Sequence, residues 1–273
     1  MQFGDEALSL RRLEATVDAA RDCGFAAVSV NDHFVFQTPW LDGPTALASV
    51  IGRSGEMELA TTIALASLRG PVPLAKALTA LDVLSQGRLI AGVGPGSSER
   101  DYRALGMPFE ERWKRFDEAV AALRALLTGT ELAPGPYRPG GIPLWIASWG
   151  SSAGLARVAR AGDGWLASAY NTTPERFANA RAALADGFPN ALATMWTWIA
   201  TDRAEADRVL TDVLAPMLRR DPDELRAQVC VGPPGHCAEL LARYAEAGCQ
   251  RVYLWPLGDE AQQIELATQA VRG

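Results

Sequence analysis

Short apolar segments alternate with helical segments along almost the whole chain, and this alternation restricts the possible folds more than any other feature. The segment 25–30 (FAAVSV) shows the pattern, because it follows a helical stretch that stops at Cys23-Gly24. It is apolar nearly throughout rather than at every second residue, which is typical of a strand covered on both faces. Repeated strand–helix units of this kind predict a parallel sheet with helices packed outside it.

Seven segments are predicted strands, and an eighth can only be Met1–Phe3, because Gly4 and Asp5 follow it at once. The seven strands are residues 25–30, 57–65, 88–93, 142–147, 164–168, 193–200 and 251–255. Helical spacing marks residues 8–21, 44–52, 71–86, 111–128, 153–161, 175–184, 205–214, 237–247 and 260–271. Seven strands would suit an open doubly wound sheet, whereas eight would close a barrel of the size that 273 residues allow. We therefore predict an α/β fold, a (β/α)8 TIM barrel with a short or clipped first strand, as a single domain over residues 1–273.

The composition excludes several classes of protein. The chain is 48% hydrophobic and 21% charged, which is ordinary for a globular domain and unlike a disordered chain. A formal net charge of -6 without a Lys/Arg-rich run argues against nucleic acid or an anionic membrane as a partner. The first residues lack the apolar core of a secretory signal, and no apolar run is long enough to span a bilayer. Four cysteines without a CxxC pair and only two histidines predict no metal site and a reduced, cytoplasmic protein.

Functional groups in such barrels lie at the carboxyl ends of the strands, and the first of these ends is Asn31-Asp32-His33-Phe34. A histidine there could hydrogen-bond a cofactor carbonyl or shuttle a proton, because imidazole exchanges protons near neutral pH. The adjacent Asp32 could fix its tautomer. The alternative is structural, with Asp32 and His33 capping the strand and bonding the backbone of the loop.

Two further strand ends give weaker signals. The segment 61–64 (TTIA) is typical of ordinary β-branched core. The segment 92–98 (GVGPGSS) lets backbone approach a ligand closely and leaves N–H groups free to face an anion, although a tight turn explains its glycines equally well. Its GxGxG spacing also differs from the GxGxxG of dinucleotide-binding folds.

The segment 148–154 (SWGSSAG) runs from a strand into the start of a helix. Hydroxyls and small residues at such a junction could hold a phosphate, because the first helical N–H groups are unpaired and the helix dipole favours an anion. The alternative is that Ser151 or Ser152 is only an N-cap. Ser168, at the end of the next strand, could add a donor to the same anion.

The chain has no GxSxG, HExxH or P-loop motif, so hydrolysis is poorly supported. The segment 232–235 (GPPG) predicts the turn before a helix. Trp149, Trp165 and Trp255 lie at strand ends and would suit a flat conjugated ligand, although core packing is the alternative for Trp165.

Several stretches together resemble the luciferase-like monooxygenase family, whose members are (β/α)8-barrel enzymes that use FMN or the deazaflavin coenzyme F420. The most specific stretch runs from residue 74 to residue 94 (LAKAL, then LDVLSQGRL into GVG). It is supported by Cys23-Gly24-Phe25 leading to Asp32-His33, by residues 161–165 (AGDGW), and by Ala247-Gly248 before residues 251–254 (RVYL). The resemblance covers most of the chain.

The resemblance implies roles for the strand ends. A non-prolyl cis peptide between Thr62 and Ile63 would lie beneath the flavin or deazaflavin ring, and His33 would lie near its reactive edge with Asp32 beside it. The glycine turn would line the ring and the ribityl chain through Gly94, Gly96 and Ser97. The implied phosphate-binding residues are Ser148, Gly150, Ser151, Ser152, Ala167 and Ser168.

The resemblance also implies a reaction. The segment 28–34 (VSVNDHF) is similar to the F420-using branch, so we expect hydride transfer between coenzyme F420 and a small organic substrate. An FMN-dependent monooxygenase is the first alternative, and a non-catalytic flavin-binding barrel is the second. Sugar-phosphate dehydrogenases of the F420 branch carry a glutamate where this chain has Ser97, which argues against glucose 6-phosphate as the substrate. We also expect a homodimer.

Overall fold

The computed structural model describes residues 8–129 and 131–272, so the predicted first strand Met1–Phe3 lies outside the described residues. The strands are β1 (Ala27–Val30), β2 (Glu58–Thr61), β3 (Ala64–Leu65), β4 (Leu89–Gly94), β5 (Leu144–Ala147), β6 (Gly164–Ser168), β7 (Asn190–Ile199), β8 (Cys230–Gly232) and β9 (Val252–Pro256). The α-helices are α1 (Leu10–Asp22), α2 (Gly43–Ser49), α3 (Ala66–Arg69), α4 (Pro71–Leu84), α5 (Glu99–Ala104), α6 (Arg112–Thr128), α7 (Ser152–Ala161), α8 (Pro174–Arg181), α9 (Arg203–Arg208), α10 (Ala215–Leu218), α11 (Pro222–Arg226), α12 (Pro234–Glu246) and α13 (Glu260–Arg272).

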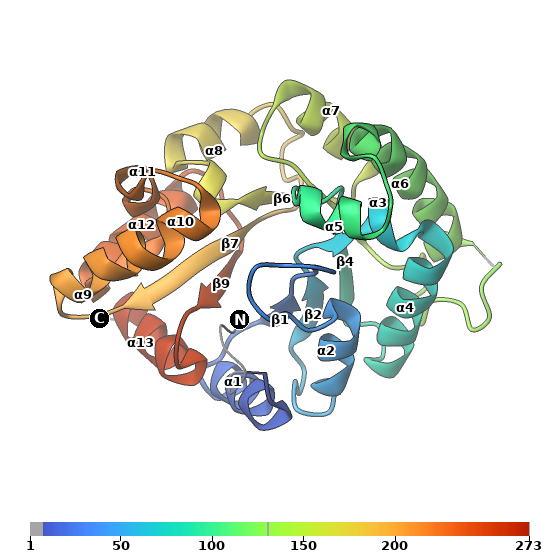
Figure 1. The fold of residues 1–273 in the computed structure, drawn as a ribbon. Helices are drawn as coiled ribbons and strands as arrows, with labels where there is room; N and C mark the ends of the chain where they lie inside the picture. The colour runs from blue at the N-terminus through green and yellow to red at the C-terminus, as the bar shows by residue number, and fades with distance from the viewer. Residues whose placement is uncertain (1–7, 130, 273) are drawn as a thin grey trace.

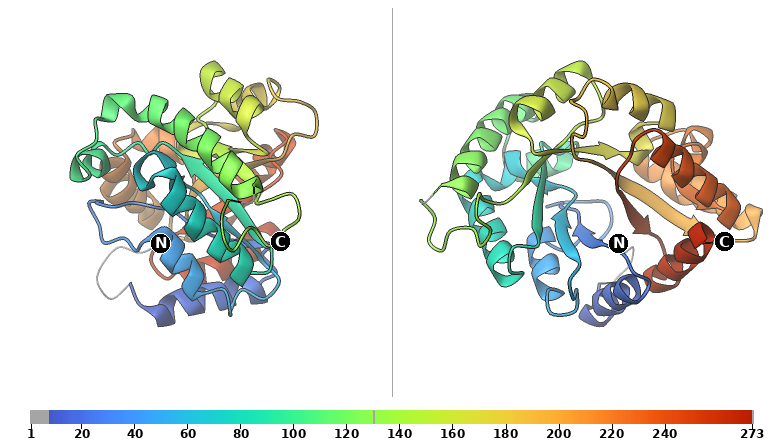
Figure 2. Two further views of the ribbon diagram at one scale, coloured as in Figure 1. Left: turned by 90° about the vertical axis from the view of Figure 1, so that its right-hand side faces the viewer. Right: turned by 180° about the vertical axis from the view of Figure 1, so that it is seen from behind.

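All strand pairs are parallel. The sheet curls inside an arc of helices (Figure 1), and Figure 2 shows the same arrangement from the side and from behind. The strand order is β1-β2-β4-β5-β6-β7-β8, with β3 beside β4 and β9 beside β7. In the part of the chain that the structure describes, β1 and β9 do not pair. The predicted parallel, curled sheet is therefore present, but the described strands form an open barrel rather than a closed one of eight.

Three predicted elements differ from the structure. The strand expected over residues 57–65 is two strands, because the chain changes direction at Thr62-Ile63 between β2 and β3. The segment 232–235, expected as a turn before a helix, joins β8, which ends at Gly232, to α12, which begins at Pro234. β8 has only three residues and is too short to give a sequence pattern. The helix expected over 205–214 begins at Arg203 and runs on past residue 214, as α9, a π-helix (Val209–Leu214) and then α10, which contains Pro216.

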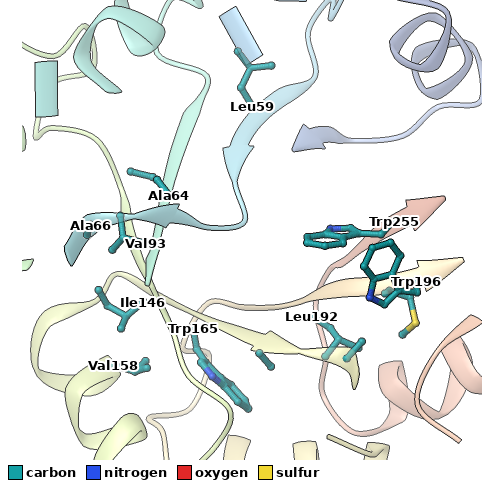
Figure 3. Close-up of a cluster of buried hydrophobic side chains, with 14 of the residues drawn as sticks. Leu59, Ala64, Ala66, Val93, Ile146, Val158, Trp165, Leu192, Trp196 and Trp255 are labelled. Carbon is teal, nitrogen blue, oxygen red and sulfur yellow. The ribbon is translucent and has the colours of Figure 1, made fainter. Parts of the chain in front are cut away.

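Two apolar layers hold the sheet. The large outer layer packs strand residues such as Ile146, Trp165 and Leu192 against the helices (Figure 3). The smaller inner layer is rich in alanine. Trp165 is 1% exposed and stacks on Phe177 of α8 at 4.8 Å, so it belongs to the outer core and is not a platform for a ligand. No helix in the described ranges is long and apolar enough to cross a membrane.

Candidate active site

His33 lies in the loop after β1, and a carboxylate from α5 holds its ring. Nδ1 of His33 is 2.8 Å from Oδ2 of Asp101. The other carboxylate oxygen of Asp101 accepts the N–H groups of Phe34 at 3.0 Å and Val35 at 2.6 Å. Asp101 is only 1% exposed, so these hydrogen bonds replace the water that the carboxylate has lost. The loop and α5 are therefore joined at one side chain.

The charge of Asp101 determines which nitrogen of His33 carries a proton. Burial by itself raises the pKa of Asp101, but the hydrogen bonds from His33 and from the amides of Val35 and Phe34 outweigh it, so the pKa lies below its ordinary value. An ionised carboxylate only accepts hydrogen bonds, so Nδ1 of His33 is the donor. In the neutral ring, Nε2 is then the nitrogen that carries the lone pair and can accept a hydrogen bond or a proton.

Aromatic rings continue from His33 toward β9. His33 stacks on Phe36 with ring centroids 4.3 Å apart and meets Trp40 edge-on at 5.1 Å. Trp40 lies 6.4 Å from Trp255, which in turn contacts Trp196 at 5.1 Å; Figure 3 shows these last two rings next to each other. We call these five rings the aromatic wall. The partly exposed Phe36 and Trp40 give the site an apolar side, and the buried Trp255 of β9 and Trp196 of β7 support them from the core.

Asp32 does not contact His33 through its carboxylate as the sequence suggested. Its two oxygens accept the guanidinium of Arg69 at 2.6 and 2.7 Å, and one of them also accepts the N–H of Leu65 at 3.1 Å. Arg69 further contacts the carboxylate of Asp42 at the other end of the loop. Asp32 therefore fixes the backbone around the site, and the role expected for it belongs to Asp101.

The predicted cis peptide between Thr62 and Ile63 is confirmed. The N–H of Ile63 donates to the side-chain oxygen of Asn31 at 3.1 Å, which ties this segment to the end of β1. Gly94 lies against it, since a Cβ at Gly94 would be 2.7 Å from Cδ1 of Ile63. Gly96 has φ +81, which favours glycine, and a Cβ there would be 2.7 Å from Leu65. The segments that follow β2 and β4 therefore lie close together, and Ser97 is exposed beside them.

The predicted phosphate residues from β5 gather at the start of α7. Ser151 is the N-cap and accepts the N–H of Gly154 at 3.2 Å, and Oγ of Ser148 accepts the N–H of Gly150 at 3.2 Å. A Cβ at Gly154 would be 2.2 Å from Oγ of Ser148 and 3.1 Å from Oγ of Ser151. Only glycine therefore lets the first turn of α7 approach both hydroxyls. Ser152 follows as an exposed residue at the helix start.

The predicted phosphate residues from β6 lie on the strand next to β5, and Ser168 has side-chain partners of its own. Oγ of Ser168 is 2.8 Å from Oγ1 of Thr194 and accepts Nδ2 of Asn171 at 2.9 Å. Oδ1 of Asn171 accepts the guanidinium of Arg220 at 2.8 Å. Ala167 is 3% exposed within the outer core, because alternate residues of β6 face opposite sides of the sheet. Its side chain therefore cannot line the site.

Sequence reasoning missed Asp101, Arg69 and Trp40. Asp101 and Arg69 come from short helices that the sequence pattern did not reveal, and each acts through a residue far away in the chain. The one local signal for α5 is Ser98, which accepts the N–H of Asp101 as an N-cap.

A family model described as luciferase-like monooxygenase matches residues 2–214, which is more than half of the chain. This chain belongs to the luciferase-like monooxygenase family. Within curated proteins, an F420-dependent glucose-6-phosphate dehydrogenase of Beutenbergia cavernae is 30% identical over 249 residues, or 81% of this chain and 68% of that protein.

Solved structures with low sequence identity share the fold. Monooxygenase RslO1 from Streptomyces bottropensis matches with a TM-score of 0.83 at 22% identity, over 99% of this chain and 96% of that chain. An F420-dependent secondary alcohol dehydrogenase in complex with an F420-acetone adduct matches with a TM-score of 0.79 at 19% identity, over 96% and 94% of the two chains.

Proposed function

We propose that this luciferase-like chain is an F420-dependent oxidoreductase that moves a hydride to or from a small organic substrate. The observation that carries the proposal is the His33–Asp101 pair, which presents an imidazole acceptor beside the aromatic wall at the carboxyl ends of the strands. The likeness to an F420-dependent dehydrogenase supports the same cofactor.

The residues of the site suit a long, flat cofactor with a phosphate. The inner layer of the sheet contains Ala60, Ala147, Ala191 and Ala193 beside larger residues such as Leu166 and Tyr253, and the small alanine side chains would suit a ring system packed on them. The hydroxyls of Ser148 and Ser151, with the first turn of α7, suit a phosphate group. When bound, F420 would supply the two-electron hydride chemistry, and the protein would supply binding and orientation.

The chain's own groups then have distinct tasks. His33 would hold or relay a proton at Nε2 as charge changes nearby, and Asp101 would keep the ring in the tautomer that allows this. The aromatic wall would exclude water from the same side, which strengthens electrostatic interactions inside the site.

A binding titration tests the cofactor. Purified protein is titrated with F420 and, separately, with FMN. The quenching of tryptophan fluorescence should saturate, and it should do so at a lower concentration of F420 than of FMN. The substitution Trp40→Phe should reduce the quenching amplitude, whereas Trp113→Phe, at an exposed position of α6, should leave the cofactor-dependent change intact. Saturable binding of FMN without binding of F420 would favour the FMN monooxygenase instead. Binding of either cofactor with no turnover of alcohols, aldehydes or sugar phosphates would favour the non-catalytic barrel.

A further inference from the structure

The half-buried side chain of Arg220, between α10 and α11, carries a charge that no carboxylate neutralises in the part of the chain that the structure describes. Its Nη2 donates to Oδ1 of Asn171 at 2.8 Å, and its Nη1 donates to the carbonyl of Arg219 at 3.3 Å. The half-buried Arg69, by contrast, is paired with a carboxylate. A guanidinium has five N–H donors, so these two bonds leave donors of Arg220 for a ligand.

The groups that hold Arg220 on the side of the strand ends are neutral. Asn171 donates from Nδ2 to Oγ of Ser168 at 2.9 Å, and that oxygen lies 2.8 Å from Oγ1 of Thr194. Tyr170 lies beside them. Burial raises the pKa of Tyr170, and its neighbours Asn171 and Arg220 act in the opposite direction. These amide and hydroxyl groups orient the guanidinium and leave its charge in place.

Arg220 lies at the same end of the sheet as His33. Asn171, which accepts from the guanidinium, comes just after the carboxyl end of β6. In the loop after β1, Nε2 of Gln37 donates to the carbonyl of Met217 in α10 at 3.1 Å. This bond joins the loop that carries His33 to the helix that leads into Arg220. The imidazole and the guanidinium therefore both lie at the carboxyl end of the barrel, where substrates bind in this architecture.

The chemistry of this cation favours a carboxylate as its ligand. The forked donors of a guanidinium match the planar geometry of a carboxylate and can bind both of its oxygens. A phosphate monoester carries nearly two negative charges at neutral pH, whereas Arg220 supplies one positive charge and the adjacent Arg219 is exposed. One half-buried guanidinium among neutral groups thus suits a singly charged anion.

We propose that Arg220 binds a carboxylate of the substrate, so that the substrate is a small hydroxy acid or the corresponding oxo acid. This inference rests on the hydride-transfer function proposed above. The carboxylate would take no part in the redox step. Its contact with Arg220 would position the carbon that exchanges the hydride, and it would select acids over neutral alcohols of the same size.

An NMR titration of the full chain, first alone and then with F420, measures binding directly. The Nε–H signal of Arg220 is assigned by its loss in Arg220→Lys. It should shift saturably with lactate or 3-hydroxybutyrate. Propane-1,2-diol and butane-1,3-diol, which carry an alcohol in place of the carboxylate, should not shift it. The absence of any shift with the acids, equal shifts with the diols, or tighter binding of inorganic phosphate would each overturn the proposal.

Two substitutions separate a specific contact from a general effect of charge. Arg220→Gln should raise the Kd of the hydroxy acid at least about tenfold, because hydrogen bonds to a charged group are lost. Arg219→Gln is the matched control, since it removes the same charge from the adjacent, exposed residue and should change that Kd less than about twofold. The Kd of F420 should stay the same in both variants. Equal weakening of acid binding by the two substitutions would overturn the proposal.

Failure of the proposed function would give a different pattern of results. If the chain binds no F420, but the Arg220 signal still shifts with lactate and Arg220→Gln abolishes binding, the carboxylate site stands and the cofactor proposal is wrong. If F420 binds and is reduced with propane-1,2-diol, but Arg220→Gln changes neither the Kd nor the rate for the hydroxy acids, the oxidoreductase stands and the carboxylate site is overturned.

Discussion

Nδ1 of His33 lies 2.8 Å from the carboxylate of Asp101, although 68 residues separate them in the chain. The imidazole is thus oriented by α5, which follows the glycine turn after β4, as well as by the rings of Phe36 and Trp40 in its own loop. The ends of β1 and β4 are joined by this contact. A substitution in α5 should therefore affect the candidate active site through His33, without contacting a ligand itself.

His33→Ala should lower the rate of hydride transfer at least tenfold, because general acid–base assistance is typically worth about 100- to 10,000-fold. Cofactor affinity should change little, since the phosphate site at α7 is built from other residues. Single-turnover absorbance of F420 measures the rate, and fluorescence quenching measures the affinity. A variant that transfers hydride at the wild-type rate would reduce His33 to a loop-anchoring role.

Ser151→Asp should weaken cofactor binding roughly tenfold or more, about 1.4 kcal/mol, because the new carboxylate would face the phosphate. Aspartate is as good an N-cap as serine, so α7 and the stability of the fold should be preserved. Titration with the cofactor and thermal unfolding separate the two effects. Unchanged affinity in a folded variant would place the phosphate elsewhere.

Asp101→Asn should destabilise the protein at pH 7 by roughly 1–3 kcal/mol, because a buried carboxylate that accepts three hydrogen bonds is lost. The folded-state pKa of Asp101 is lowered, so its contribution is complete above the unfolded-state pKa of about 3.9 and is lost as the pH falls through the folded-state pKa. The difference between wild type and variant should therefore shrink below about pH 4. Urea unfolding at both pH values measures it, and a constant difference would contradict the ionised pair.

Gly154→Ala should cost roughly 1–3 kcal/mol of stability, because its Cβ would lie 2.2 Å from Oγ of Ser148. Gly235→Ala is the matched control, since Gly235 lies in the first turn of α12 with nothing within 4 Å of an added Cβ. Alanine there should be neutral or stabilising by up to about 1 kcal/mol. Thermal unfolding of both variants tests the pair, and similar midpoints would mean that the α7 turn can relax.

Continuous apolar runs were sufficient to predict the parallel sheet, and β6 has the predicted bounds Gly164–Ser168. The cis peptide at Thr62-Ile63 was predicted from the family resemblance alone, because the surrounding residues 59–65 (LATTIAL) are those of an ordinary strand and give no local signal. Asp101 could not be found in this way, since its function depends on the packing of α5 against a loop far away in the chain.

The guanidinium of Arg69 binds Asp32 and contacts Asp42, and these two carboxylates lie at the two ends of the loop after β1. The guanidinium of Arg69 therefore holds the two ends of the loop together. This contact offsets the entropy cost of closing the loop. Residues between the two ends can be replaced or lengthened at a modest further cost, since closure entropy grows only slowly with loop size. The loop thus has a fixed base, and substitutions at residues 37–39, between the rings of Phe36 and Trp40, should cost less stability than substitutions at Asp32 or Asp42.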